Sequence, residues 1–341
     1  MQRRATSSDV AARAGVSRAA VSMVLNGRAE GNVSTSNQEA IRAAAAELGY
    51  VPNSVARSLR SSRTHTVGVV TDAIVTTAFG GRLLSGAMDA ADAAGYLTLV
   101  LDTRRDDERT ARSFDLLRER QVDGLMFAAM ELRAFTPPPV MRELPSVVAQ
   151  AWDPEESVTS VWCDEVGGGR AAAQALLDAG HRDVAMLAGT DDVVATRRRV
   201  QGFHEALAAA GLPRVEPVTT GWEIRTGYDA ALPLLGRPDR PTGIVCANDR
   251  VAAGVVLAAA TLGLAVPQDL SVVGYDDDEN VAPVMAPPLT TVGLPHRQMG
   301  EEAMRRLLAD LTGEPSPPQH GVLDCPLVER GSVTAPPAAR R

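Results

Sequence analysis

Apolar residues recur with a helical period through the first fifty residues of the chain. They fall into three groups, Val10, Ala11 and Ala14, then Ala20, Val21, Val24 and Leu25, then Ile41, Ala44, Ala45 and Leu48. Thr6, Ser17 and Ser34 precede these groups and can cap helix N-termini, while Gly15 and Gly49 follow two of them where a helix would end. The pattern predicts three short helices, and the Gly-containing turn between the first two is typical of a helix-turn-helix.

From residue 66 onward, short β-branched runs alternate with Ala- and Leu-rich stretches. The predicted strands are VGVVTDAI, YLTLVLD, GLMFAAM, SVVAQA, VAMLAG, TGIVCAND and SVVGYDD, and the predicted helices include 82–94, 110–120, 167–179, 199–210 and 250–262. This alternation is typical of α/β folds with doubly wound parallel sheets. The series is too long for one sheet and repeats after about residue 163, which predicts two lobes around a cleft. Ligands of such sheets bind outside the carboxyl ends of the strands.

Charge is divided unevenly along the chain. The 341 residues carry a net charge of −8, which would argue against nucleic acid if it were evenly spread. Residues 1–63 contain nine Arg and four acidic residues, a charge of +5, so the remainder carries −13. A mere basic tail would not show the helical period and caps of this segment. A compact basic head on an acidic body therefore favours a DNA-binding module joined to a sensing domain.

The second predicted helix carries the candidate DNA-reading residues, because in a helix-turn-helix the N-terminal residues of the second helix meet base edges when that helix enters the major groove. Those residues are Arg18, Ala19, Ala20, Ser22 and Met23. Arg18 can bond guanine O6 and N7 bidentately, worth about 1–3 kcal/mol of discrimination, whereas the alanines offer apolar contact, for example to a thymine methyl. Ser17 and Asn26 are placed for phosphate contacts, and Thr6 completes the predicted set.

The sequence also argues against several other classes of protein. No GxGxxG follows the first strand and no P-loop occurs, so Gly167–Gly169 is interpreted as a helix N-terminus that needs room. His181 follows a helix and is interpreted as structural rather than catalytic. Cys163, Cys246 and Cys325 are odd in number and widely spaced, which favours reduced thiols in a cytoplasmic protein over disulfides or a metal site. No apolar run suits a signal peptide or a membrane span.

The string TSSDVAARAGVSRAAVSMVLNG, followed by AAAAELGYVPNSVARSLR and THTVGVV, resembles the lactose/galactose-repressor (LacI/GalR) family of transcriptional regulators. The match covers nearly the whole chain. In that family the YxPN segment leads into a hinge helix that folds on operator DNA, and a leucine wedges into the central minor-groove step, where unstacking is offset by better wrapping. The resemblance assigns this role to Leu59, with Asn53 and Ala56 on the same short helix.

In the body the resemblance extends to periplasmic sugar-binding proteins and supplies candidate effector-binding residues. The matching positions are Arg199 (in RVQGF), Asn248 and Asp249 (the ND motif), Asp276 (in GYDD), Trp222, and, on the first lobe, Asp72 and Phe79. Carboxylates, an amide and a guanidinium can bond vicinal hydroxyls bidentately, while an aromatic face covers the apolar side of a sugar ring. The resemblance therefore implies a sugar effector, with a nucleobase, nucleoside or other small metabolite as the alternative.

Several positions depart from the family pattern. Met23 stands where a basic or polar residue is common, which puts a base contact in doubt. The loop GRAEGN is long and contains glycine, and Asn37 and Gln38 replace a usual Thr-Arg pair, so backbone contacts to DNA would change. Gln150 lies where family members often carry Asp, a difference that would alter how hydroxyl groups are recognised.

The resemblance also sets the expected parts of the chain. They are a helix-turn-helix DNA-binding domain, a hinge helix with linker, an effector-binding domain and a disordered tail, at 1–51, 52–65, 66–332 and 333–341. The N-lobe is expected at 66–162 with 291–320, and the C-lobe at 163–290 with 321–332. No leucine heptads occur near the carboxyl end, so a homodimer is expected, and its twofold symmetry requires a palindromic site.

The expected function is therefore a sequence-specific, DNA-binding transcriptional regulator. The leading hypothesis is a repressor of carbohydrate-utilisation genes that a sugar releases from its operator, and the alternative is a regulator that needs a small-molecule corepressor. A sugar-binding or transport component without DNA function is a third hypothesis, which the basic head and the lack of a signal peptide disfavour. No enzyme activity, cofactor, metal or membrane partner is expected.

Overall fold

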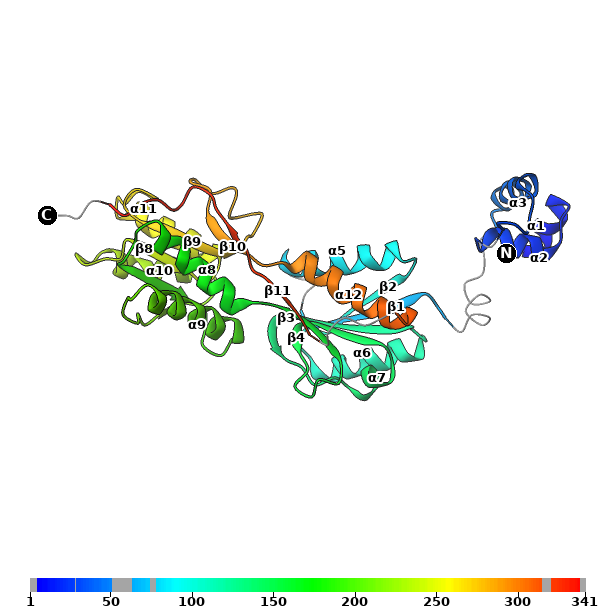
Figure 1. Cartoon of the computed structure of the whole chain (residues 1–341), viewed down its shortest axis with the longest axis horizontal. Helices are drawn as coiled ribbons and strands as arrows, with labels where there is room; N and C mark the ends of the chain where they lie inside the picture. The colour runs from blue at the N-terminus through cyan, green and yellow to red at the C-terminus, as the bar shows by residue number, and fades with distance from the viewer. Residues whose placement is uncertain (1–4, 28, 51–62, 74–77, 315–319, 338–341) are drawn as a thin grey trace. The chain divides into compact units, whose positions relative to one another are not determined.

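The computed structural model describes residues 5–27, 29–50, 63–73, 78–314 and 320–337. The chain divides into two compact units, Met1–His65 and Thr66–Arg341, which are called here the head and the body. Figure 1 labels their helices and strands. The predicted hinge residues Asn53, Ala56 and Leu59 lie outside the described residues.

The head contains three helices, as the apolar pattern predicts. They are α1 Ser7–Ala14, α2 Arg18–Leu25 and α3 Thr35–Glu47. Val10, Val21 and Ile41 are almost fully buried at their common centre, with Ala44 and Ala45 packed beside them. The predicted alternation of inward and outward positions is therefore confirmed for all three helices.

Capping explains where the head helices begin. Thr6 and Asp9 form a capping box around the N-terminus of α1. The Oγ atoms of Ser17 and Ser34 accept hydrogen bonds from the backbone N–H groups three residues later, at 3.1 and 3.4 Å. Gly15 ends α1 with a φ of 68°, a left-handed conformation that glycine adopts without steric cost.

The body contains two six-stranded sheets, one in each lobe (Figure 1). The N-lobe sheet has the order β11-β5-β4-β3-β1-β2, with bounds His320–Leu323, Thr159–Cys163, Ser146–Trp152, Gly124–Ala134, Thr66–Thr71 and Leu97–Asp102. The C-lobe sheet has the order β12-β10-β9-β8-β6-β7, with bounds Leu327–Val328, Thr290–Gly293, Ser271–Asp276, Gly243–Cys246, Val184–Ala188 and Val218–Thr219. All described pairings are parallel except that of β12 with β10.

The chain passes between the lobes three times, and two of these passages differ from the expected boundaries. Residues 291–293 were expected in the N-lobe, but β10 pairs with β9 in the C-lobe sheet. Residues 321–323 were expected in the C-lobe, but β11 pairs with β5 in the N-lobe sheet. Each strand therefore completes its sheet before the chain leaves the lobe, because its backbone groups need the ladder partners.

Eight helices of the body are described. Their bounds are α5 Ala78–Ala93, α6 Asp107–Glu119, α7 Pro139–Glu143, α8 Glu165–Asp178, α9 Val194–Ala209, α10 Ile224–Leu235, α11 Asp249–Thr261 and α12 His296–Thr312. Helices α5 and α12 pack together on the N-lobe, and α8 with α9 and α10 with α11 pack together on the C-lobe. The five helices that the sequence predicts all form, within a few residues of their expected bounds.

Each of these three helix pairs meets at reciprocal glycines. A Cβ on any of the six would collide with a backbone atom of the partner helix, and the residues concerned are Gly86 and Gly300, Gly169 and Gly202, and Gly227 and Gly254. The glycines therefore set how closely the helices approach. This explains the predicted need for room at Gly167–Gly169, where Gly168 is also crowded by Tyr275 and the Cβ of Cys325.

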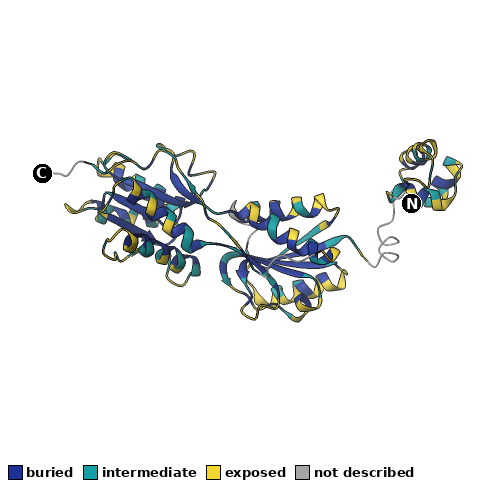
Figure 2. Ribbon diagram, viewed as in Figure 1, coloured by how far each residue is buried: buried dark blue, intermediate teal, exposed yellow. Residues whose placement is uncertain are grey.

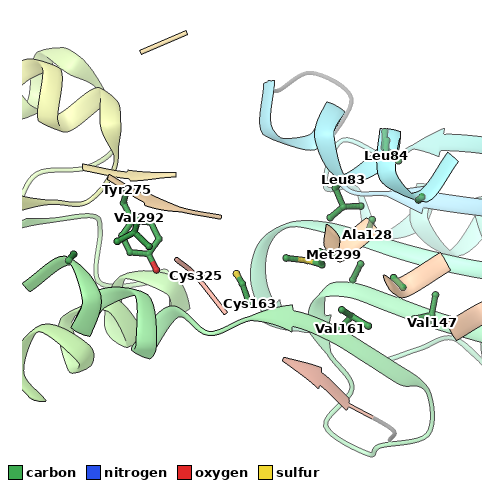
Figure 3. Packing of buried hydrophobic residues seen from close by; sticks show 14 of the residues in the cluster. Leu83, Leu84, Ala128, Val147, Val161, Cys163, Tyr275, Val292, Met299 and Cys325 are labelled. Atoms are coloured by element: carbon green, nitrogen blue, oxygen red, sulfur yellow. The ribbon is translucent and has the colours of Figure 1, made fainter. Parts of the chain in front are cut away.

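The central strands of both sheets are buried, while the edge strands and the outward faces of the helices are more exposed (Figure 2). One cluster of buried side chains runs from the N-lobe into the C-lobe along the crossing segments. It includes Leu83 and Met299 on one side and Tyr275 and Val292 on the other, with Cys163 on a crossing segment between them (Figure 3). All three cysteines are buried and free.

Residues 333–337, which the sequence predicts as part of a disordered tail, have a defined place on the C-lobe. The Thr334 carbonyl lies 2.9 Å from the His181 ring and 3.1 Å from the Ser271 hydroxyl, which donates to it. The Thr334 N–H in turn donates to Ser271 Oγ. The prediction of disorder is therefore wrong for residues 333–337, because these polar contacts tie the segment to the sheet. His181 also contacts Thr242, which fits its predicted structural role.

Candidate functional site

The exposed face of α2 carries the predicted base-contacting residues. Arg18 and Ala19 are exposed at its N-terminus, and Met23 is 38% exposed one turn later. Ser22 and Ala20 are partly covered. An arginine followed by small apolar side chains leaves this end of the helix open to approach by another molecule.

The polar residues around α2 are held in place by local hydrogen bonds. Ser17 caps the helix, and the Asn26 amide donates to the Ser22 carbonyl and hydroxyl at 2.6 and 3.2 Å. Thr6 donates to Asp9 at 2.8 Å. These bonds fix the two ends of the helix-turn-helix, so the predicted phosphate-contacting groups have a defined orientation before any partner binds.

The departure at Gln38 has a structural consequence. Its amide donates to the Val33 carbonyl at 2.9 Å and accepts from Arg42 at 3.3 Å, while the Asn37 N–H is bound by the Ser34 cap. The Gln38 side chain therefore stabilises the loop before α3 and does not project freely.

In the body, a cavity of about 420 Å³ opens between the lobes. It is lined by Met130, Glu131, Leu132, Gln150, Glu165, Val193, Ala195, Arg199, Trp222, Glu223, Asn248, Arg250, Asp276, Leu294 and His296. Four residues of the predicted effector set, Arg199, Trp222, Asn248 and Asp276, come together here. Asn248 and Asp276 stand at the carboxyl ends of β8 and β9, as expected for ligand sites of parallel sheets, whereas Arg199 comes from α9 and Trp222 from the segment between β7 and α10.

Arg199 is the electrostatic centre of the cavity. Its Nε and NH2 atoms donate to the Glu165 carboxylate at 2.7 and 3.3 Å, and NH1 donates to the Ala247 carbonyl at 2.6 Å. The Asp276 carboxylate lies 3.6 Å away, and the guanidinium stacks on Tyr275 at 3.7 Å from the ring centre. Burial by itself lowers the pKa of Arg199, but the anionic neighbours outweigh burial and raise the pKa. The guanidinium therefore stays protonated and positively charged.

The ionisable groups beside Arg199 are strongly affected by burial. Burial raises the pKa of Asp276 well above its ordinary value, although Arg199 opposes the shift. Burial lowers the pKa of His296 to about 4, so this imidazole is neutral at pH 7. The wall of the cavity therefore offers a neutral ring and a carboxyl with a high proton affinity next to a permanent cation.

Asn248 and Trp222 are linked to each other. The Asn248 side-chain oxygen caps α11 by accepting from the Val251 N–H at 2.8 Å, and its amide donates to the Trp222 carbonyl at 3.1 Å. The Trp222 ring lies directly against Gly189, where a Cβ would not fit. The Asn248 cap and the close packing against Gly189 thus hold the Trp222 ring at the cavity wall.

Four charged lining residues, Glu131, Glu165, Glu223 and Arg250, were not supplied by the family motifs. Glu165 is buried beside Arg199, Glu131 projects from β3, and Glu223 forms a pair with Arg250 at 3.4 Å. The one available signal was position: Glu165 is the first residue of α8, and a single residue separates it from the end of β5.

Gln150, the departure on β4, also lines the cavity. Its φ is 52°, a left-handed conformation that costs energy for a residue with a side chain. Its side-chain oxygen accepts from the Cys163 thiol at 3.4 Å. The amide therefore replaces a carboxylate at this point of the wall.

The remaining candidates lie elsewhere. Asp72 is buried and lines a second, neighbouring cavity of about 240 Å³ instead of the first. The Phe79 side chain is outside the described residues, although its backbone belongs to α5. Asp249 accepts hydrogen bonds from Asp278 N and the Thr291 hydroxyl at 2.7 and 2.6 Å and does not line the first cavity, so it ties α11 to β10.

Comparison with known proteins finds a matching family model for each of the two units. Residues 6–53 match the family model described as bacterial regulatory proteins, lacI family, and residues 173–333 match a periplasmic binding protein-like domain. The ribose operon repressor of Escherichia coli (strain K12) is 36% identical over 334 residues, covering 96% of this chain and 100% of the relative. The chain belongs to the lacI family. It is a DNA-binding transcriptional regulator with the fold of that family.

Solved structures of family members agree with this assignment. The lac repressor dimer bound to operator and the anti-inducer ONPF has a TM-score of 0.79 at 28% identity, covering 98% of this chain and 100% of that one. The complex of the regulator CelR with cellobiose has a TM-score of 0.67 at 34% identity, covering 96% and 100%. Both the head and the two-lobed body of this lacI-family chain therefore have counterparts of known structure.

The described parts of this regulator contain neither a candidate membrane span nor a candidate metal site. None of the described helices combines the length and apolar character that a bilayer crossing requires. Within the same ranges, no cluster of three or more His, Cys, Asp or Glu side chains is arranged to hold a metal ion.

Proposed function

We propose that this lacI-family regulator is a homodimeric, sugar-responsive repressor that acts in the cytoplasm on a palindromic operator. The observation that carries the proposal is the cavity between the lobes, where Arg199, Asp276 and Asn248 converge beside the Trp222 ring. Guanidinium, carboxyl and amide groups can bond the hydroxyls of one sugar face, and the indole can cover the opposite face. A cavity of about 420 Å³ lies within the range of about 300–1,000 Å³ typical of small-molecule sites.

The position of the cavity supports an allosteric role. Its wall is drawn from both lobes, with Gln150 and His296 on one side and Arg199 and Trp222 on the other. A ligand that bonds to both sides favours the closed arrangement of the lobes over the open one. Only such differential binding can shift the equilibrium of a protein between two states.

The DNA-contacting set is proposed as Thr6, Ser17, Arg18, Ala19, Ala20, Ser22, Met23 and Asn26, together with the hinge residues Asn53, Ala56 and Leu59. The exposed N-terminus of α2 and the fixed caps on either side of it support this set.

The sign of the response is tested by titrating sugars into an operator-binding assay with the full-length chain. We expect the active sugar to weaken operator binding by about 5- to 150-fold, the usual range of allosteric coupling. Arg199→Ala should abolish the sugar effect while the variant still binds operator. Tighter operator binding on addition of the ligand would instead identify a corepressor, which is the alternative mechanism. Equal affinity for the chain's own upstream DNA and random DNA would contradict the function itself.

A further inference from the structure

The second cavity, of about 240 Å³, lies entirely in the N-lobe. It is lined by Asp72, Arg105, Asp107, Thr110, Glu131 and Arg133. Asp72 and Arg105 follow β1 and β2, and Glu131 and Arg133 lie near the carboxyl end of β3, which is the edge where parallel α/β sheets bind ligands. Asp107 and Thr110 come from the first turn of α6. Because Glu131 also lines the cavity between the lobes, the two cavities adjoin at this residue.

The local backbone is built to hold this wall in place. Strand β3 changes register between Ala128 and Arg133, and the buried Asp72 carboxylate accepts from the Met130 N–H at 2.7 Å within that irregular stretch. Such irregularities in strands re-aim side chains next to functional sites. Asp72 therefore positions the segment that carries Glu131 and Arg133.

The opposite side of the cavity is held in an unusual conformation. Arg104 and Arg105 follow β2 with φ values of 55° and 60°, both left-handed, and the Arg105 N–H donates to the Asp72 carbonyl at 2.6 Å. Two consecutive residues with side chains in this region are costly, and such strain gathers at ligand sites. The cost is explained if the turn serves to place the Arg105 side chain over the cavity.

The charges of the cavity disfavour an anion. Arg105 pairs with Glu131 at 2.6 Å, and Arg133 pairs with Asp72 at 3.4 Å, so each arginine already has a carboxylate. Three carboxylates face two guanidiniums across the cavity. Planar carboxylates and guanidiniums beside the Thr110 hydroxyl suit the hydroxyls of an uncharged ring.

The size of the cavity makes it an extension rather than a separate site. It falls below the range of about 300–1,000 Å³ typical of independent ligand pockets. We propose that it is a subsite for a second, uncharged sugar unit, so that the effector is a neutral disaccharide or longer oligosaccharide that spans both cavities. This inference rests on the proposed sugar response of the cavity between the lobes.

The test is isothermal titration calorimetry of the full-length chain. The ligands are neutral mono-, di- and trisaccharides of glucose, galactose, mannose, xylose and ribose, together with glucose 6-phosphate. We expect one di- or trisaccharide to bind at least tenfold more tightly than its component monosaccharide. Arg105→Ala and Thr110→Val should remove that advantage and leave the monosaccharide affinity unchanged. Arg109→Ala is the matched control, since Arg109 is an exposed arginine on the same segment that does not line the cavity.

The outcomes separate the subsite from the proposed function. If a monosaccharide binds in an Arg199-dependent way but no longer sugar binds more tightly, the subsite is wrong and the sugar response stands. If the length advantage survives in both Arg105→Ala and Thr110→Val, the second unit lies elsewhere and the subsite is again wrong. Tighter binding of glucose 6-phosphate than of every neutral sugar would overturn the uncharged ligand class. If no sugar in the panel binds, the proposed sugar response and the subsite both fail.

Discussion

At the scale of single residues, the carboxyl groups of the body show how burial couples protonation to stability. Asp249 is 1% exposed, and burial raises its pKa to about 7. An aspartate in an unfolded chain has a pKa of about 3.9. Between about pH 4 and pH 7 the folded state therefore keeps a proton on Asp249 that the unfolded state has lost. The stability supplied by that proton is complete below about pH 4 and is lost as the pH rises through 7.

We expect this titration to cost the wild type about 1 kcal/mol of unfolding free energy between pH 6 and pH 8. His296 and His181 have pKa values lowered by burial, so their effect has the opposite sign and acts as the pH falls below about 6.5. The measurement is therefore the difference between wild type and Asp249→Asn in urea unfolding at several pH values. Asp115→Asn, at an exposed position on α6, serves as control. An unchanged pH slope in Asp249→Asn would contradict the assignment.

Arg18 is the residue on which sequence reading is proposed to depend. It is exposed at the first position of α2, where a bidentate bond to guanine is worth about 1–3 kcal/mol. We expect Arg18→Ala to weaken operator binding by that amount and to relax preference at one base pair of each half-site. Arg42→Ala removes an equal charge from the exposed surface of α3. Fluorescence anisotropy with operator and single-base variants should show loss of discrimination only for Arg18→Ala.

At the scale of secondary structure elements, the caps of the head connect stability to DNA binding. Ser17 caps α2 and Ser34 caps α3 through equivalent hydrogen bonds. Replacing either by alanine should cost about 1 kcal/mol of head stability. Only Ser17→Ala frees the N-terminus of the helix that carries Arg18. We therefore expect similar losses in thermal unfolding of the head but a larger loss of operator affinity for Ser17→Ala, and equal losses of affinity would contradict a special role for α2.

The reciprocal glycines of α5 and α12 give a prediction within one helix. Alanine is about 1 kcal/mol more favourable than glycine inside a helix. At Gly81 of α5 a Cβ would meet nothing within 4 Å, so Gly81→Ala should stabilise the body. At Gly86 a Cβ would collide with the Arg297 carbonyl, and separating two packed helices costs about 1–3 kcal/mol. Gly86→Ala should therefore lower the thermal midpoint, and a stabilised Gly86→Ala would show that the two helices can separate freely.

The elements also show which features of the fold the sequence could predict. Periodicity and caps located the head helices because these signals are local. Helix α10 contains Pro233, which local rules would place outside a helix interior. Strands β10 and β11 are short, and only their ladder partners β9 and β5 decide which lobe each joins. Long-range pairing of this kind leaves no mark in the local pattern.

At the scale of the whole molecule, the residues of the cavity also divide into those that the sequence could predict and those that it could not. Arg199, Asn248, Asp276 and Trp222 stand in motifs that resemblance can transfer. Glu131 lines the cavity from a stretch of β3 whose register shifts, and His296 lines it only because α12 packs on the N-lobe. These contributions depend on tertiary packing, and neither residue has a distinguishing sequence context. The motif residues thus indicate where the ligand binds, whereas the shape of the wall requires the fold.

The uneven charge of the chain yields a prediction for the complete regulator on DNA. The first 63 residues carry +5 and the rest carries −13, so DNA binding depends on the heads. Each phosphate contact releases counterions, and the slope of log K against log salt is about −0.9 per neutralised phosphate. A dimer that places both heads on a palindrome neutralises twice as many phosphates as one that engages a single half-site.

We therefore expect the salt slope for the full palindromic operator to be about twice that for DNA carrying one half-site. The measurement is operator affinity by anisotropy between 50 and 300 mM KCl, at a protein concentration where the dimer is intact. Random DNA of the same length is the control, since it reports the sequence-independent part of the binding. Equal slopes for the palindrome and the half-site would mean that only one head engages, which would contradict the proposed twofold mode of binding even if the affinity for the operator were high.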